Sequence, residues 1–188
     1  MNIENDYIWA LNVIEQFYTK DGELYNILVT HSKQVADHAV NVLKLHPEIE
    51  ADSHFVYRAA MLHDIGIIKT DATGICCHGT YPYICHGYLG ADMLRSIGLQ
   101  QYALVAERHT GTGLTSEYIK EAKLPLPTGR IYTPMSIEEQ LICYSDKFYS
   151  KTKLHTCRSV EQVEKSLSKW GEETVAKFKE WHHIFSGT

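Results

Sequence analysis

The chain has 188 residues, of which 44% are hydrophobic and 22% charged, and its formal net charge is −5. This composition is typical of a soluble globular protein, and the negative charge excludes the basic surface of a protein that binds duplex nucleic acid or an anionic membrane. No apolar run approaches the ~18 residues of a transmembrane helix, and the acidic N-terminus does not resemble a signal peptide. We therefore expect one cytoplasmic domain over residues 1–188.

Apolar residues recur at helical spacing along almost the whole chain. The pattern predicts helices at about residues 6–19, 23–45, 53–64, 86–96, 99–109, 115–122, 136–150 and 160–184. Residues 69–85 and 123–135 are predicted to be loops, because both are rich in residues that break helices. No alternating run of strand length is present, so the expected fold class is all-α.

Five cysteines are present, an odd number, and without a secretion signal they are expected to be reduced. Cys76, Cys77 and Cys85 cluster with His78 and His86. A structural zinc site is conceivable there, but the spacing matches none of the usual ligand pairs, and we do not favour it.

Ionisable residues interrupt several of the predicted apolar helix faces, and another opens a helix. They are His31, His63, Asp64, His109 and Asp146, with His86 at the helix start. A lone histidine on an apolar face is more often a hydrogen-bonded core residue, but an aspartate is rarely buried without a partner. Because a helical bundle can bring inward-facing ligands from separate helices to one point, the set together predicts a metal site. Imidazole and carboxylate ligands suit transition metals better than Ca or Mg.

These residues lie in short motifs that resemble the HD superfamily of metal-dependent phosphohydrolases. The motifs are His31-Ser32 before Val35-Ala36, Leu62-His63-Asp64-Ile65-Gly66, His86-Gly87 before Gly90-Ala91, Arg108-His109-Thr110-Gly111 and Tyr144-Ser145-Asp146-Lys147. They follow the family order over residues 31–150. A single His-Asp pair is a weak signal, whereas the ordered set is a strong one.

The resemblance implies an HD-type helical bundle with a metal-binding core at about 23–150 and a terminal helix at about 160–184. It implies that a first metal is bound by His31, His63, Asp64 and Asp146. In branches with extra histidines, His86 and His109 would bind a second metal and Asp64 would bridge the two. Since both extra histidines are present, we favour two divalent ions, chosen among Fe, Mn, Ni, Co and Zn, over one.

The implied activity is hydrolysis of a nucleotide or another small phosphate ester or anhydride by a metal-bridging hydroxide. Asp64 and Lys69 are the expected catalytic residues. Arg108, Arg130 and Lys147 are weaker candidates for binding the substrate. The alternative for each is a solvated surface charge, which explains Arg108 and Lys147 about equally well. The terminal helix is expected to pack on the bundle, with a homodimer contact as a secondary possibility.

Several alternatives remain open at this level. The sharpest substrate hypothesis is diadenosine tetraphosphate, which one bacterial branch of similar length cleaves symmetrically. A di-iron oxygenase could use the same ligands, and a non-catalytic sensor could use the same bundle, although sensors often lose ligands and here all six are present. The branch that cleaves cyclic dinucleotides has a Gly-Tyr-Pro signature and a His-His-Glu run. Residues 108–113 depart from that pattern, so we do not expect that activity.

Overall fold

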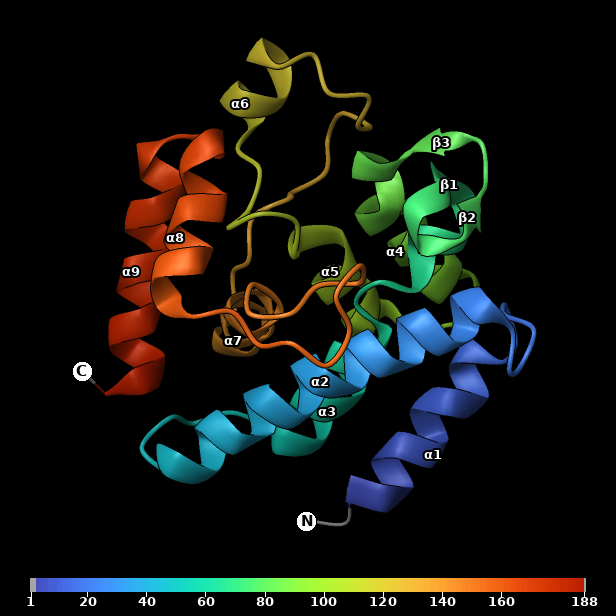
Figure 1. Ribbon diagram of the computed structural model, residues 1–188, viewed down its shortest axis with the longest axis horizontal. Coiled ribbons are helices and arrows are strands. Elements are labelled where there is room, and N and C mark those ends of the chain that lie inside the picture. Colours follow the sequence, from blue (N-terminus) through green and yellow to red (C-terminus); the bar gives the residue numbers. More distant parts are fainter. Residues whose placement is uncertain (1–2, 188) are drawn as a thin grey trace.

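The computed structural model describes residues 3–187, and helices dominate it (Figure 1). The α-helices are α1 (Ile3–Ile14), α2 (Glu23–Leu45), α3 (Ser53–Leu62), α4 (His86–Ser96), α5 (Gln100–Arg108), α6 (Ser116–Glu121), α7 (Ile137–Asp146), α8 (Val160–Leu167) and α9 (Glu172–Ser186). Short 3₁₀ helices are η1 (Ile65–Lys69), η2 (Thr73–Ile75), η3 (Tyr83–Cys85) and η4 (Ser168–Trp170). The predicted all-α class is confirmed. Within residues 3–187, no helix combines the length and the apolar character needed to cross a membrane.

The centre of the fold is α3, which packs against α1, α2 and α7. The Asp52 side chain caps the start of α3 by accepting hydrogen bonds from the backbone N–H groups of His54 and Phe55. The last four residues of α3, 59–62, are fully buried. A buried Leu or Met side chain contributes roughly 1.5–3 kcal/mol, so burial anchors the C-terminal end of this helix. The residues that directly follow it, His63 and Asp64, therefore lie inside the core.

Three glycines allow α4 to approach η1 and α5 closely. A Cβ atom on Gly66 would overlap the His86 carbonyl oxygen and the backbone of Gly90, and one on Gly87 would lie 2.9 Å from the Ala106 carbonyl oxygen. The backbone of α4 is therefore in direct contact with the backbones of η1 and α5, which larger side chains at these glycines would hold apart. This close approach brings the first residue of α4 beside the segment that follows α3.

A small sheet occupies part of the predicted loop 69–85. Strand β1 (Thr70–Ala72) pairs antiparallel with β2 (Cys77–His78) and parallel with β3 (Tyr81–Pro82), in the order β2-β1-β3. Strands of two or three residues are too short to show an alternating pattern, which is why the sequence did not reveal them. The segment predicted as a loop therefore contains three short strands.

The predicted terminal helix is divided in two. Helix α8 ends in η4, and Gly171 has a φ of +111°, a conformation that favours glycine and interrupts the helix. Helix α9 then packs on α7, with Phe178, Trp181 and Phe185 at most 1% exposed. The expected packing against the bundle is observed, and the homodimer contact stays a prediction.

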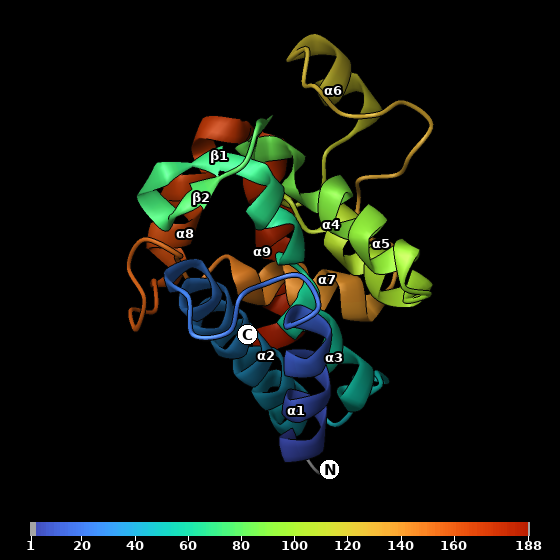
Figure 2. The ribbon, with the colours of Figure 1, turned by 90° about the vertical axis from the view of Figure 1, so that its right-hand side faces the viewer.

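Helix α6 stands apart from the rest of the fold. It lies at the end of a long excursion between α5 and α7 that projects from the body in both views (Figure 1 and Figure 2). None of its residues is buried. The excursion leaves the body at Gly111 and Gly113, whose φ angles are +64° and +99°.

Candidate metal centre

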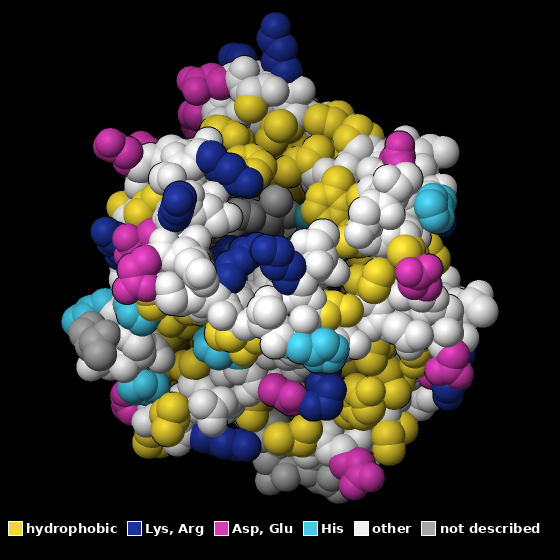
Figure 3. Space-filling model, viewed as in Figure 1, with side chains coloured by type: hydrophobic (Ala, Val, Ile, Leu, Met, Phe, Trp, Pro, Cys, Tyr) yellow, Lys and Arg dark blue, Asp and Glu magenta, His cyan; other side chains and the backbone are white. Residues whose placement is uncertain are grey.

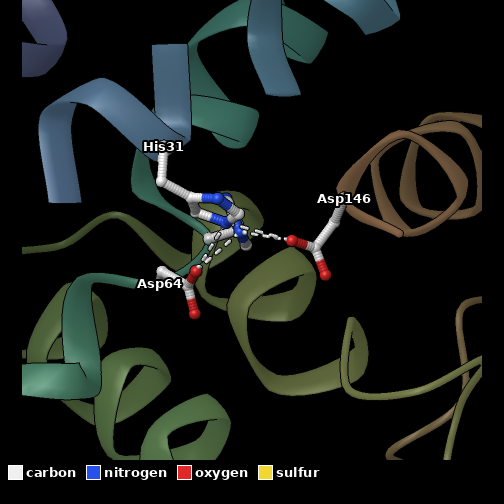
Figure 4. Close-up of side chains that lie close together, drawn as sticks. His31, Asp64 and Asp146 are labelled. Atoms are coloured by element: carbon white, nitrogen blue, oxygen red, sulfur yellow. Dashed lines mark ion pairs between the residues drawn. The ribbon is translucent and has the colours of Figure 1, made fainter. Parts of the chain in front are cut away.

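Six side chains from five segments meet at the centre of the bundle. His31 comes from the middle of α2, His63 and Asp64 directly follow α3, His86 opens α4, His109 directly follows α5, and Asp146 ends α7. Figure 4 shows His31, Asp64 and Asp146 pointing toward one another from three different elements. All six are the residues that the sequence predicted as metal ligands.

The donor atoms form two overlapping groups joined by Asp64. One group contains His31, His63, Asp64 and Asp146, the other Asp64, His86 and His109, and the ligand atoms within each lie within 4.8 Å of one another. Asp64 Oδ2 is 3.2 Å from His31 Nε2 and 2.9 Å from His63 Nε2. Asp64 Oδ1 is 3.4 Å from Nε2 of both His86 and His109. The two oxygens of one carboxylate thus face two different histidine pairs.

Three of the histidines are held by their other ring nitrogen. Nδ1 of His63, His86 and His109 donates a hydrogen bond to the carbonyl oxygen three residues earlier, at 2.6, 2.6 and 2.8 Å. This bond fixes the tautomer in which Nε2 carries a lone pair, as is usual for histidine ligands of metals. The three rings are therefore oriented to bind a cation at Nε2.

Several buried polar atoms of this cluster lack any hydrogen bond within the described chain. They are both ring nitrogens of His31, Nε2 of His63 and both carboxylate oxygens of Asp64. These nitrogen and oxygen atoms of the cluster lie close together, but their contacts do not have the geometry of hydrogen bonds. Leaving such atoms buried and unpaired costs several kcal/mol in total, at roughly 1–3 kcal/mol per group. A divalent cation at this point would bind Nε2 of His31, Nε2 of His63 and a carboxylate oxygen of Asp64, although not Nδ1 of His31, so the residues present fit a metal site.

The electrostatics of the cluster also favour a cation. Burial alone would raise the pKa of Asp64, but Lys151 and His63 hold it well below its usual range. Burial alone would lower the pKa of His63, but Asp64 and Asp146 raise it to about 9. Burial and then the neighbouring His109 lower the pKa of His86 to about 3. Without a metal ion, a proton on His63 offsets the negative charge of the two carboxylates. A bound metal ion would take over that role.

The centre opens to solvent through one cavity of about 460 Å³, which we call the metal-centre cavity. His86, His109 and Asp146 line it, whereas His31, His63 and Asp64 do not and are at most 1% exposed. Its apolar walls include Ile75, Tyr83, Tyr149, Leu167 and Trp170. The volume lies in the range of small-molecule sites, so a molecule of nucleotide size can reach the side chains of His86, His109 and Asp146.

The predicted cationic residues lie in different places. Lys69 has an exposed side chain and does not line the metal-centre cavity. Arg108 forms an ion pair with Glu139 at 2.9 Å, and Arg130 pairs with Asp92 and Glu107. Lys147 does line the cavity, and its ammonium is 2.8 Å from Asp146 Oδ2. The proposed roles of these residues stay predictions, and of the four only Lys147 is placed at the centre.

Lys151 is the residue that the sequence analysis missed. Its ammonium lies 2.5 Å from Asp64 Oδ2, and the side chain lines the cavity. Burial alone would lower its pKa, but Asp64 raises it, so the ammonium stays charged. Lys151 lies beyond the end of α7 in an irregular segment, where helical periodicity gives no signal. Its spacing of four from Lys147 was the one weak indication.

The cysteine cluster contributes no ligand set. Cys77 and Cys85 are buried, and the nearest hydrogen-bond acceptors of their thiols are carbonyl oxygens of Ile75 and Pro125. Across residues 3–187, no group of three converging ligands includes a cysteine. The disfavoured zinc site therefore gains no support.

Comparison with known proteins places this geometry in a family. The family model for the HD domain matches residues 28–150, which is more than half of the chain. A protein of Methanocaldococcus jannaschii described as uncharacterized is 35% identical over 122 residues, or 64% of this chain and 64% of that protein. A tRNA (cytidine(56)-2'-O)-methyltransferase of Picrophilus torridus is 28% identical over 139 residues, or 73% of this chain but 36% of that protein. The matches thus span less than two thirds of either relative.

Two solved structures share the architecture. The crystal structure of the HD domain of the L. monocytogenes phosphodiesterase PgpH has a TM-score of 0.52 at 18% identity, covering 83% of this chain and 89% of that one. The same domain in complex with cyclic-di-AMP has a TM-score of 0.51 at 17% identity, covering 87% and 96%. At such low identity this likeness concerns the fold alone.

Proposed function

Because the chain belongs to the HD domain family, we propose that it is a metal-dependent phosphohydrolase that cleaves a nucleotide or another small phosphate ester or anhydride. The observation that carries the proposal is that Asp64 and the histidines converge beside a cavity of ligand size, with several of their buried polar atoms lacking a hydrogen bond. Structural clusters satisfy their own hydrogen bonds, whereas this one leaves its lone pairs aimed at a common point.

We propose that two divalent ions bind here, one to His31, His63, Asp64 and Asp146 and one to His86, His109 and Asp64. The division of the Asp64 oxygens between the two histidine pairs supports a bridging carboxylate. When bound, such ions lower the pKa of water and offset the negative charge that develops on phosphoryl oxygens.

The chain's own cations would complete the binding of the phosphoryl group. The ammonium of Lys147 donates to the His109 carbonyl oxygen at 3.2 Å as well as lying beside Asp146, so its position is fixed at the cavity wall. Lys151 lies beside Asp64 in the same wall. Both ammonium groups can donate to non-bridging phosphoryl oxygens, which orients the phosphorus and stabilises its charge. The aromatic side chains of Tyr149 and Trp170 offer an apolar wall for the rest of the substrate.

The test begins with the full chain purified without chelators. Metal content is measured, and the protein is then assayed with Mn, Fe, Co or Ni against p-nitrophenyl phosphate, nucleotides and dinucleoside polyphosphates. We expect hydrolysis of at least one of these compounds, two bound ions per chain and one remaining ion in a His86→Ala, His109→Ala variant. Failure to cleave any of these compounds with any of the metals would reject the proposal.

The same panel tests the finer possibilities. Symmetric cleavage of diadenosine tetraphosphate in preference to the other compounds would identify that activity. Iron binding with oxygen-dependent turnover and no phosphate release would identify a di-iron oxygenase instead. Metal binding without any turnover would leave a sensor.

A further inference from the structure

A second cavity, of about 600 Å³, lies beside the metal-centre cavity. The two share Ser150, Thr152, Arg158 and Ser166 in their walls, so they adjoin each other along the segment after α7 and the side of α8. We call the second one the basic cavity. Resting on the proposed function, we propose that the substrate carries a second phosphate group, which binds in the basic cavity while the first is held at the metal centre.

The charge of the basic cavity is one-sided. Lys153, Arg158 and Lys165 line it, together with hydroxyl and amide side chains, and no Asp or Glu does. Within residues 3–187, none of these three cations is in an ion pair with a carboxylate, and the Arg158 side chain donates only to the Lys147 carbonyl oxygen, at 3.3 Å. Three positive charges without a partner in one concavity attract an anion, in a chain whose net charge is −5.

Several other cations of the chain lie beside carboxylates. Arg58, Arg95 and Arg130 each lie within 2.7 Å of a carboxylate oxygen, and Lys147 and Lys151 are paired with the two aspartates of the metal centre. Solvated surface lysines are common and by themselves indicate nothing. The cations of the basic cavity differ because they share a concave wall with the metal centre. Figure 3 shows Lys and Arg side chains gathered beside the hollow of this face.

Arg158 connects the two cavities. It lines both cavities. Its guanidinium donates a hydrogen bond to the carbonyl oxygen of Lys147, whose own side chain pairs with Asp146. A row of positive charge therefore runs from Lys151 and Lys147 through Arg158 to Lys153 and Lys165. The inner two are already opposed by aspartates, so the outer three are the ones available to a second anionic group.

Phosphate is the anion that this set of donors suits best. An arginine fork binds two phosphate oxygens at once, lysines add point charges, and the hydroxyls of Ser150 and Thr152 can donate to the remaining oxygens. Two joined cavities of bounded volume suit a small molecule, whereas a nucleic acid would require an extended basic face. The inferred substrate class is thus a compound with at least two phosphate groups, either joined in a polyphosphate chain or borne on separate positions of one molecule.

Binding of unreactive analogues tests the inference without turnover. The full chain, purified without chelators, is titrated in a calorimeter with alkane-1,n-diphosphonates of increasing chain length and with alkylphosphonates of the same lengths. We expect the best diphosphonate to bind about tenfold tighter than its monophosphonate partner, since a second charge-assisted contact is worth at least that. In a Lys153→Gln, Lys165→Gln variant the preference should disappear, while monophosphonate affinity changes less than twofold.

The control removes the same charge elsewhere. Lys20→Gln with Lys44→Gln deletes two positive charges outside both cavities, from positions exposed to solvent. It should keep the diphosphonate preference. Arg158→Lys keeps the charge but loses the fork, and we expect it to weaken diphosphonate binding by about threefold to tenfold. Equal binding of both ligand series, or equal losses in the cavity variant and the control, would overturn the inference.

Kinetics separates this inference from the proposed function. With an active enzyme, the cavity variant should raise KM for a nucleoside triphosphate or a nucleoside 3',5'-bisphosphate by about tenfold and leave p-nitrophenyl phosphate hydrolysis unchanged. A preference for the nucleoside triphosphate would indicate a polyphosphate substrate, and a preference for the 3',5'-bisphosphate would indicate phosphates on separate positions. Hydrolysis without such a preference overturns the second phosphate site and leaves the hydrolase. A diphosphonate preference without hydrolysis leaves the site and rejects the hydrolase.

Discussion

Two clusters of charged side chains lie in this small fold, and they are built in opposite ways. The first is the metal centre. The second, which we call the arginine network, consists of the hydrogen-bonded group of Asp92, Arg95, Glu107 and Arg130 and the adjacent pair of Arg108 and Glu139. In the network, Glu107 accepts hydrogen bonds from Arg95 at 3.0 and 2.6 Å and from Arg130 at 2.9 Å. In the centre, both oxygens of Asp64 are buried without a hydrogen bond among the described residues, and only Oδ2 has an ion-pair partner outside the six side chains, the Lys151 ammonium at 2.5 Å.

The difference teaches how to separate a structural charge cluster from a ligand site. Both contain acidic groups with lowered pKa values, because in both the effect of nearby cations exceeds that of burial. A lowered pKa therefore does not distinguish them. Hydrogen bonding of the acidic groups does distinguish them. The carboxylates of Glu107 and Glu139 accept hydrogen bonds on both oxygens, whereas the Asp64 oxygens accept none from residues 3–187 and lie beside unpaired nitrogens of His31 and His63.

The largest expected effect breaks the metal centre itself. Asp64→Ala removes the carboxylate shared by both histidine pairs, so we expect loss of bound metal and a fall in phosphohydrolase activity of about a thousandfold or more. Metal content and kcat/KM measure the two losses. Asp92→Ala, which removes a half-exposed acid of the arginine network, is the control and should retain metal and activity. An Asp64→Ala enzyme with normal activity would contradict the assignment.

The second effect concerns the packing that positions His86. Gly66→Ala places a methyl group against the His86 carbonyl oxygen and the Gly90 backbone, so we expect a loss of about 3 kcal/mol or more in the free energy of unfolding. Gly74→Ala is the matched control, because nothing lies within 4 Å of its added Cβ. Urea denaturation should show a change within about 0.5 kcal/mol for the control. Equal stability of the two variants would show that η1 and α4 can separate freely.

Metal removal should affect only one of the two clusters. An ion at a hundred times its dissociation constant stabilises the folded protein by about 2.7 kcal/mol, so a chelator should lower Tm by several degrees. A Glu107→Gln variant should show the same shift on chelation, because its change lies outside the centre. An Asp64→Ala variant should show none. A shift of equal size in all three proteins would mean that the ion stabilises some other part of the chain.

The smallest effect tests the arginine network. Glu107→Gln leaves Arg95 and Arg130 without a buried partner, and we expect a loss of about 1–3 kcal/mol at pH 7 with metal binding intact. The pKa of Glu107 lies below its ordinary value of 4.5, since burial raises it but the two arginines lower it further. Its contribution is therefore present above about pH 4.5 and is lost as the pH falls through the folded-state pKa. Urea denaturation of both proteins from pH 7 to 3 should show the difference shrinking at the acidic end, and a constant difference would contradict the prediction.

The helices and the six converging side chains were predictable because both depend on local information. Helical spacing of apolar residues places α2 through α5 and α7 close to their observed bounds, and imidazole and carboxylate groups on those faces indicate a metal. The resemblance to the HD superfamily rested on the same positions and is confirmed by the family model. The break at Gly171 and the short strands were missed, since each depends on a few residues without a periodic pattern.

The sequence by itself determined the fold class, the family and which side chains can bind a metal, because these follow from residue types at fixed spacing. Only the tertiary structure decided what each cation does. Arg108 and Arg130 pair with acids that distant segments bring to them, Lys151 reaches Asp64 from an irregular segment, and Arg158 joins two cavities. A long cationic side chain takes the partner that the fold places within its reach, and no local pattern records that partner.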